Sequence, residues 1–489
     1  MDSSAVAERP VASVSTVESR LVTWILIAFL AWIPLQTPVA VVAWQYLNLS
    51  VSVTQAILLV KDFWAAGLIL ILFFRHLREI RFHRFDWFAL AFVVLVFIYS
   101  VVPAMLGSHL PALAVIASAR ELLVPVELYA LGRLAGYAGV SPLRLIIGFL
   151  AIAAATAMFS IGTWAIMPRD FWTSTYNLVK FTHDVQGIQS ATDIWWASIL
   201  SYYANFGAAL RAVGPFTHPV GTGAYFAMPL ALTLCAFWTS SVKRRKVLFV
   251  SAAALILFAA AVVTPISRGT WIGITAAAVV AGVVLHKYRL ASLSIIVFVL
   301  FLVFVPPFSW AVRSAASATD SSAATPADSS SQGHIDAINY GVGVITAHPG
   351  GLGVGQGDQY GVVFSGGNDV AGVGENMYLT TYTSVGPVGT LAFIAWFGAV
   401  LFELFRRKRA TLPAWVAVGV GTGLLAEAIA ALSASTLMRF TTAASIWLLV
   451  GLVIAVPASG AFFNRADLRH PVAWLRSHGT GPDVEPAES

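Results

Sequence analysis

Charged residues are scarce in this chain. Lys, Arg, Asp and Glu make up 11% of its 489 residues, whereas apolar residues make up 58%. Soluble globular proteins carry about 25% charged residues. The composition therefore excludes an ordinary soluble protein and indicates an all-α integral membrane protein with several spans.

Cysteine and acidic pairs are equally rare. The single cysteine, Cys235, lies inside an apolar run, so it forms no intramolecular disulfide and is expected to be a small core residue. No Asp-x-Asp pair occurs, which disfavours a metal-dependent nucleotide-sugar enzyme. The glycine run at 350–357 lacks the Gly-Lys-Ser/Thr ending of a phosphate loop, and a flexible turn is its plainer account. We expect no cofactor and no metal.

The formal charge of +6 does not indicate nucleic-acid binding, because the basic residues fall in short clusters between apolar runs and no stacking aromatics interleave them. The clusters lie at 75–84, 243–246, 286–289 and 406–409. This is the pattern that the positive-inside bias gives to cytoplasmic loops.

About twelve apolar runs are long enough to span a membrane, which takes about 20 residues each. They lie at roughly 21–44, 53–74, 87–106, 112–134, 143–167, 218–240, 247–266, 269–285, 290–308, 385–405, 411–433 and 441–463. The first lacks a clear cleavage site and is expected to be retained. With the N-terminus inside, this topology places all four basic clusters in the cytoplasm. It predicts a membrane domain at 21–463 between cytoplasmic tails at 1–20 and 464–489.

Two large loops then lie on the outer side, at about 168–217 and 309–384. In the first, Asp193 is a candidate helix cap, and apolar residues recur at helical spacing at Trp196, Ile199, Leu200, Tyr203, Phe206 and Leu210. An amphipathic helix on the outer leaflet and a helix packed on the same loop explain this pattern equally well. The second loop opens with a Ser/Ala tract at 314–332, followed by a predicted short helix from His334 to Ala347.

Arg268, in "TPISRGTWIG", is expected in a very short outer turn, where basic residues are normally rare. Arginine at membrane depth costs about 2.5–3.5 kcal/mol on insertion scales. A side chain that reaches for lipid phosphate is one explanation. A ligand site is the other, because Arg211 and Arg120 are predicted near the same side, the latter with Glu121 as a partner. Guanidinium groups match phosphate oxygens with a planar fork of donors.

Other polar residues are predicted on this side. They are Glu375, Asn376, His218, His334 and His348. Glu375 has no adjacent basic residue and stands in a Gly-flanked segment near the membrane, so it is a candidate base. An exposed loop carboxylate is the alternative.

Four short motifs, in order, resemble the O-antigen ligase and polymerase superfamily of bacterial envelope glycosyltransferases. They are "RAVGPFTHPVGTGAYFAMPLAL", "SRGTWIGI", "AHPGGLGVGQG" and "ENMYLTTYTSVGPVG". The resemblance implies a GT-C-like fold and a metal-independent enzyme in the bacterial cytoplasmic membrane, with its active site on the outer side. It implies that Arg211 and Arg268 hold the diphosphate of a polyprenyl-diphosphate-linked glycan donor. Glu375 stands where the ligases have a histidine. Together with the residues Ser330, Ser331, Gly333 and His334, this glutamate makes the chain more similar to the exopolysaccharide polymerase branch.

The expected reaction is attack of a sugar hydroxyl on the anomeric carbon, with inversion and loss of the diphosphate. We assign Arg211 and Arg268 to the leaving group and Glu375 to the base. Arg120, Asn376, His218, His334 and His348 are candidate substrate contacts, the last two also second-choice bases. The expected partners are the lipid-linked donor, a glycan or lipid acceptor, membrane lipid and other envelope-polysaccharide assembly proteins.

A transporter or flippase of a lipid-linked or anionic substrate is the main alternative, and a non-catalytic scaffold is a third. Transport usually leaves ionisable residues near the middle of the bilayer. The candidates for such residues are Lys61 and Asp62, which are expected to neutralise each other, and Glu427.

Overall fold

The computed structural model describes most of the chain. It covers residues 16–105, 110–168, 171–187, 201–204, 207–216, 218–240, 245–304, 329–358, 360–361, 376–409 and 411–461. Within these residues the protein is mainly α-helical, which confirms the helical class predicted from composition.

The apolar runs of the N-terminal part form five long helices and several short elements. They are α1 (Thr16–Gln45), α2 (Val51–His76), α3 (Asp86–Met105), α4 (Ala112–Tyr137), α5 (Pro142–Ile166), the π-helical turn η1 (Phe171–Thr175), α6 (Leu178–Asp184), β1 (Ser201–Ala204), β2 (Gly207–Leu210) and the 3-10 turn η2 (Gly214–Phe216).

The C-terminal part continues the bundle. Its elements are α8 (Pro219–Thr239), α9 (Arg245–Val263), α10 (Arg268–Val284), α11 (Tyr288–Phe304), α13 (Ser329–Ala347), α15 (Met377–Arg406), β3 (Arg407–Arg409), α16 (Ala414–Ala430), α17 (Phe440–Ala455) and β4 (Ala458–Ala461). The helix predicted from His334 to Ala347 is α13.

A described helix overlaps each of the twelve predicted spans. Seven of them are long and apolar enough to cross a membrane, namely α1, α2, α3, α5, α8, α9 and α15. Helices α10, α11, α16 and α17 are apolar but shorter. Helix α4 carries four charged residues, Arg120, Glu121, Glu127 and Arg133. A multi-pass membrane protein follows from these helices, while twelve spans and a GT-C-like fold stay predictions.

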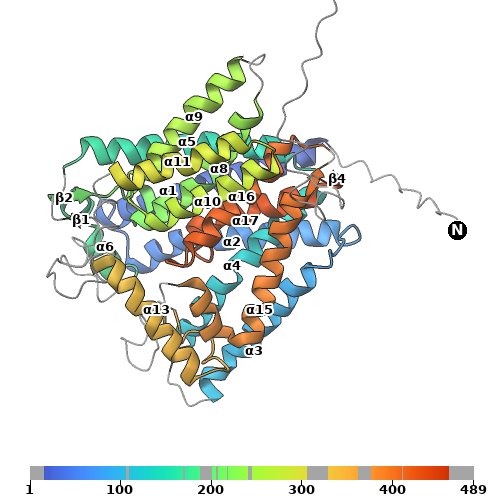
Figure 1. The fold of residues 1–489 in the computed structure, drawn as a ribbon. Helices are drawn as coiled ribbons and strands as arrows, with labels where there is room; N and C mark the ends of the chain where they lie inside the picture. The colour runs from blue at the N-terminus through green and yellow to red at the C-terminus, as the bar shows by residue number, and fades with distance from the viewer. Residues whose placement is uncertain are drawn as a thin grey trace, which may run out of the picture.

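Helix α17 lies in the middle of the bundle, where nearly all its residues are buried, and it crosses α4 closely (Figure 1). Two glycines make this approach possible. A Cβ at Gly451 would collide with the Tyr129 carbonyl, and a Cβ at Gly132 with the Leu448 carbonyl. Small residues at crossings let membrane helices pack backbone to backbone, where van der Waals contact is the main attraction.

The first large loop differs from its prediction. Ser201–Ala204 and Gly207–Leu210 pair as antiparallel strands, with Ser201 opposite Leu210, so the predicted amphipathic helix is wrong over these residues. Gly207 disfavours a helix there, and the aromatic residues Tyr202 and Tyr203 favour extended backbone. Residues 193–200 lie outside the described part.

The glycine run is a turn, as predicted, but backbone hydrogen bonds fix it between helices. The Leu352 N–H donates to the Thr383 carbonyl of α15 at 2.8 Å, and the Val354 N–H donates to the Tyr99 carbonyl of α3 at 3.1 Å. Gly353 has φ +102° and lies against Pro103, so a side chain is excluded there by both conformation and space. The turn therefore joins α13 to the body of the protein, and α13 lies beside α15 (Figure 1).

Candidate functional site

Arg211 and Arg268 meet at one short turn. The Arg211 guanidinium donates from Nε to the Pro265 carbonyl at 2.8 Å and from Nη2 to the Ile266 carbonyl at 3.5 Å. Arg268 follows as the first residue of α10. Ile266 has φ +52°, a strained value for a β-branched residue, and the bonds from Arg211 help to hold it. The two arginines that the motifs singled out thus share one turn, which marks what we call the Arg268 end of the bundle.

This turn packs against the last turn of α16. Gly269 lies so close to Ala430 and Ser433 that a Cβ there would collide with the Ser433 hydroxyl. The Met377 N–H, which opens α15, donates to the Ala431 carbonyl at 3.0 Å. The start of α10, the end of α16 and the start of α15 therefore lie together at the Arg268 end.

Asn376 fixes the start of α15. Its Oδ1 accepts from the N–H groups of Tyr378 at 3.0 Å and Leu379 at 3.1 Å, while its Nδ2 donates to the Leu432 carbonyl at 2.9 Å. The first two bonds are those of a helix N-cap. Glu375 directly precedes Asn376 in the sequence and lies outside the described residues. The predicted role of Glu375 stays a prediction.

His218 caps α8 at the same end. Its Nδ1 accepts the Val220 N–H at 3.2 Å, so the neutral ring carries its proton on Nε2. Burial, followed by the charges of Arg439 and Arg211, lowers the pKa of His218 to about 3. His218 is therefore a neutral hydrogen-bond donor rather than a base.

Three residues near the Arg268 end were not predicted from the sequence, namely Arg439, Asp358 and Tyr360. Arg439 is the N-cap of α17, and its charge acts on His218 and on Glu121 of α4. Arg439 stands before the last apolar run as Arg268 stands before α10. The same signal, a basic residue in a predicted outer turn, points to it.

Asp358 and Tyr360 follow the glycine turn. Asp358 Oδ1 accepts the N–H groups of Tyr360 at 2.9 Å and Gly361 at 3.0 Å. Burial raises the pKa of Asp358. Burial also raises the pKa of Tyr360, on which the charges of Glu121, Arg120 and Arg439 act. The turn after α13 thus places the Asp358 carboxyl and the Tyr360 phenol near the charges of α4 and of Arg439 at the start of α17.

Arg120 has a different main partner from the predicted Glu121. Its Nε and Nη2 both donate to Asp62 Oδ1 of α2, at 2.8 and 2.5 Å, instead of pairing mainly with the adjacent Glu121. Lys61 Nζ lies 3.6 Å from Asp62 Oδ2, as expected for that pair. The Phe440 ring lies 5.4 Å from Lys61 Nζ and 5.9 Å from the Arg120 guanidinium carbon. Asp62 therefore pairs with two cations, Lys61 and Arg120.

The remaining predicted residues have other partners or no described contact with the turn. Glu427 is fully buried in α16 and accepts a hydrogen bond from Thr436 Oγ1 at 2.7 Å. His348 is exposed at the end of α13, where its carbonyl accepts the Gly351 N–H at 2.9 Å. His334 lies in α13, and its side chain is outside the described part. Cys235 is buried, as expected.

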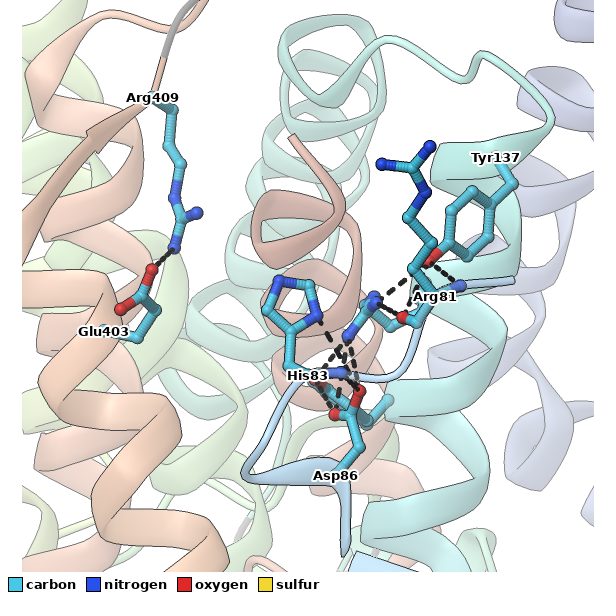
Figure 2. A network of polar contacts seen from close by, with 8 residues as sticks. Arg81, His83, Asp86, Tyr137, Glu403 and Arg409 are labelled. Carbon is cyan, nitrogen blue, oxygen red and sulfur yellow. Dashed lines mark hydrogen bonds and ion pairs between the residues drawn. The ribbon is translucent and has the colours of Figure 1, made fainter. Parts of the chain in front are cut away.

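A second polar network occupies the other end of α4, about 20 Å from Arg120 along the helix. Asp86, at the start of α3, accepts from Arg133 Nη1 at 3.1 Å, Tyr129 Oη at 2.8 Å and the His83 N–H at 2.6 Å. Figure 2 shows Asp86 beneath the loop that carries Arg81 and His83, with Glu403 and Arg409 paired nearby. These bonds tie a basic loop to the helices, which is a structural role.

Scans of the chain against known protein families and against curated proteins found no match. The assignment of a function therefore depends on the residues and their geometry.

Proposed function

We propose that this protein is a membrane glycosyltransferase of the O-antigen ligase and polymerase type. In this proposal it transfers or polymerises a glycan from a polyprenyl-diphosphate donor onto a sugar hydroxyl, at the outer face of the bacterial cytoplasmic membrane. The observation that carries the proposal is the turn at which Arg211 bonds the Pro265 and Ile266 carbonyls directly before Arg268. Two arginines at one turn between apolar helices suit a lipid-linked diphosphate.

The reaction forms a bond between the acceptor oxygen and the anomeric carbon, while the bond from that carbon to the diphosphate oxygen breaks. The diphosphate leaves with the electron pair, and the hydroxyl proton passes to a base. Arg268 stabilises the charge that develops on the leaving group, because a fixed cation acts strongly where water is excluded. Arg211 holds the turn and adds its charge. Glu375 takes the proton, and Asn376 positions the chain that carries it.

The acceptor face of the site is assigned to the turn after α13. The Asp358 carboxyl and the Tyr360 hydroxyl can hydrogen-bond sugar hydroxyls there. His218 donates from Nε2 at the same end of the bundle.

Analysis of lipid-linked glycans in a deletion strain tests the proposal. Accumulation of single lipid-linked repeat units indicates a polymerase, and accumulation of long lipid-linked chains indicates a ligase. Unchanged lipid-linked and surface glycans would contradict the proposal.

One observation favours transport as a second candidate function. Lys61, Asp62 and Arg120 form a charged group on helices, and Lys61 lies about 15 Å from the start of α2. Charged residues at such depth often mark a substrate path. If the protein is a transporter, Asp62→Asn should abolish flux of its anionic substrate and leave glycosyl transfer unaffected. The glycosyltransferase proposal predicts no flux of an anionic solute in liposomes that contain the purified protein.

A further inference from the structure

An apolar cavity of about 410 Å³ lies among four helices of the C-terminal part. Leu234 of α8, Ala259 of α9, Ala278 of α10, and Leu293 and Val297 of α11 contribute to its walls. Its volume is in the range of ligand sites, about 300–1,000 Å³. Because α8 and α9 are candidate spans, the cavity lies at the depth of lipid chains.

Three polar groups on the cavity wall are already bonded to the protein. The Trp271 indole N–H donates to the Val262 carbonyl at 2.7 Å, and Thr275 Oγ1 donates to the Trp271 carbonyl at 2.9 Å. Ser294 Oγ donates to the Leu290 carbonyl at 3.0 Å. The cavity wall is therefore almost entirely apolar, which suits hydrocarbon better than a sugar or an ion.

Helix α10 connects this cavity to Arg268. Trp271, Ile274, Thr275 and Ala278 line the cavity from one face of α10. Arg268 precedes Trp271 by three residues and Thr275 by seven, so it lies on the same side, one turn nearer the helix start. The cavity also reaches Val262 and Val263, the last residues of α9 before the turn. One ligand can therefore contact both features, with a charged end at Arg268 and an apolar chain below it.

We infer that this cavity binds the hydrocarbon chain of the polyprenyl-diphosphate donor, beginning next to the diphosphate. The inference deepens the proposed function and rests on it. The chain lies between α9 and α11 along α10, so the donor is held both at its diphosphate, by Arg268, and along its hydrocarbon chain, by the cavity. Because the chain is already in an apolar medium, its affinity for the cavity comes from van der Waals contact with the cavity wall.

Filling the cavity tests the inference. Ala259→Trp and Ala278→Trp put bulk into it, and Ile256→Trp is the matched control, since Ile256 is 72% exposed on the same helix α9 and does not line the cavity. Purified variants are assayed with two donors that carry the same glycan diphosphate, one on a full-length polyprenyl chain and one on a chain of two isoprene units. We expect the cavity variants to raise KM for the long donor by about tenfold, because the added indole occupies the space of the chain. Their kcat should equal the wild-type value, and their KM for the short donor should rise less, because two isoprene units make fewer contacts with the cavity wall. Ile256→Trp should match wild type with both donors.

The outcomes separate the two proposals. Wild-type protein that transfers glycan from neither donor overturns the proposed function. Transfer in which the cavity variants keep the wild-type KM for the long donor overturns the chain site alone.

A second measurement covers the case in which both cavity variants fail to fold. Wild-type protein is photolabelled with polyprenyl diphosphate that carries a diazirine in its first isoprene units, and the labelled peptides are mapped. Labels on α9, α10 or α11, displaced by unlabelled polyprenyl diphosphate, support the inference. Labels elsewhere, or labels at the cavity that ordinary phospholipid displaces equally well, overturn it.

Discussion

At the scale of single residues, an arginine in a short turn between apolar helices must be stabilised by a partner or by a ligand. Arg211 shows one solution, because its guanidinium bonds the carbonyls of a turn in which Ile266 has positive φ. Arg268, half-buried as the first residue of α10, lies beside that turn. The pair therefore combines a structural bond with a fixed positive charge, as a diphosphate site requires.

Glu375→Gln tests the assignment of the base. The amide keeps the shape of the side chain and removes its basicity, so we expect glycosyl transfer to fall by about a hundredfold or more. Initial rates at saturating donor, with membrane levels matched by quantitative blotting, measure the effect. His348→Gln serves as the control. Normal turnover of Glu375→Gln, together with a strong loss of transfer in His348→Gln or His334→Gln, would assign the role of the base to a histidine.

His218 gives a pH dependence of stability. Its folded-state pKa of about 3 lies below its ordinary value of 6.5, so between these pH values the unfolded chain binds the proton more readily. Stability should therefore fall as the pH is lowered from 7 towards 4. His218→Asn keeps a side-chain cap for α8 and should show a smaller loss of Tm over that interval. Thermal unfolding in detergent at several pH values checks this, and equal slopes for both proteins would contradict it.

Part of the site was accessible from sequence. Arg211 and Arg268 were predicted to act together because each stands at the same predicted side of an apolar run. In the structure, Arg211 bonds the turn that directly precedes Arg268. The Arg120–Asp62 pair was not predicted, since its members are 58 residues apart and only the packing of α2 on α4 joins them. Sequence proximity instead predicted that Arg120 pairs with the neighbouring Glu121.

At the scale of elements, close crossings between helices determine where the site residues lie. Arg133 and Arg120 are on α4, and Arg439 precedes α17, so the crossing of α4 and α17 sets the distance between these charges. The glycines at this crossing remove the side chains that would separate the two backbones. The crossing is therefore a point at which a single methyl group matters.

Gly451→Ala tests the α4–α17 crossing. The new methyl group would collide with the Tyr129 carbonyl and with the Arg133 backbone nitrogen, so we expect a loss of about 1–3 kcal/mol of stability. Gly398→Ala in α15 is the control, because nothing lies within 4 Å of its added Cβ and alanine favours helix. Thermal unfolding in detergent measures both. A Gly451→Ala protein as stable as the control would show that the crossing is looser than described.

The helices could be predicted because long apolar runs leave little alternative in a membrane. The strands at 201–204 and 207–210 could not, since the two described residues of the helical pattern, Tyr203 and Leu210, also fit short extended segments. The spacing of apolar residues does not reveal the backbone conformation at Gly207, nor which residues the strands contact.

At the scale of the whole molecule, the basic clusters and the candidate site lie at opposite ends of the helices. Helix α10 begins at Arg268 and ends next to the cluster at 286–289, while α15 begins at Met377 and ends next to 406–409. Helix α9 begins beside 243–246 and ends at the Arg268 turn. This separation is what the positive-inside bias predicts if the Arg268 end faces outward.

Cysteine labelling tests this orientation in a Cys235→Ala background. Arg78 and Thr346 are both exposed, and the proposal places them on opposite sides of the membrane. A membrane-impermeant maleimide should label Thr346→Cys in intact cells from which any outer barrier has been removed. It should label Arg78→Cys only after the membrane is opened. The reverse pattern would place the site in the cytoplasm and contradict the proposed donor leaflet.

The most direct test of a diphosphate site is Arg268→Lys in purified protein with a polyprenyl-diphosphate-linked glycan donor. Lysine keeps the charge but lacks the planar fork, so the account predicts a loss of transfer of about tenfold or more at normal membrane levels. Arg289→Lys, an exposed residue in a basic cluster at the other end of α10, should retain wild-type transfer. Wild-type transfer by Arg268→Lys would instead mean that Arg268 only contacts lipid phosphate, and the proposed site would be wrong.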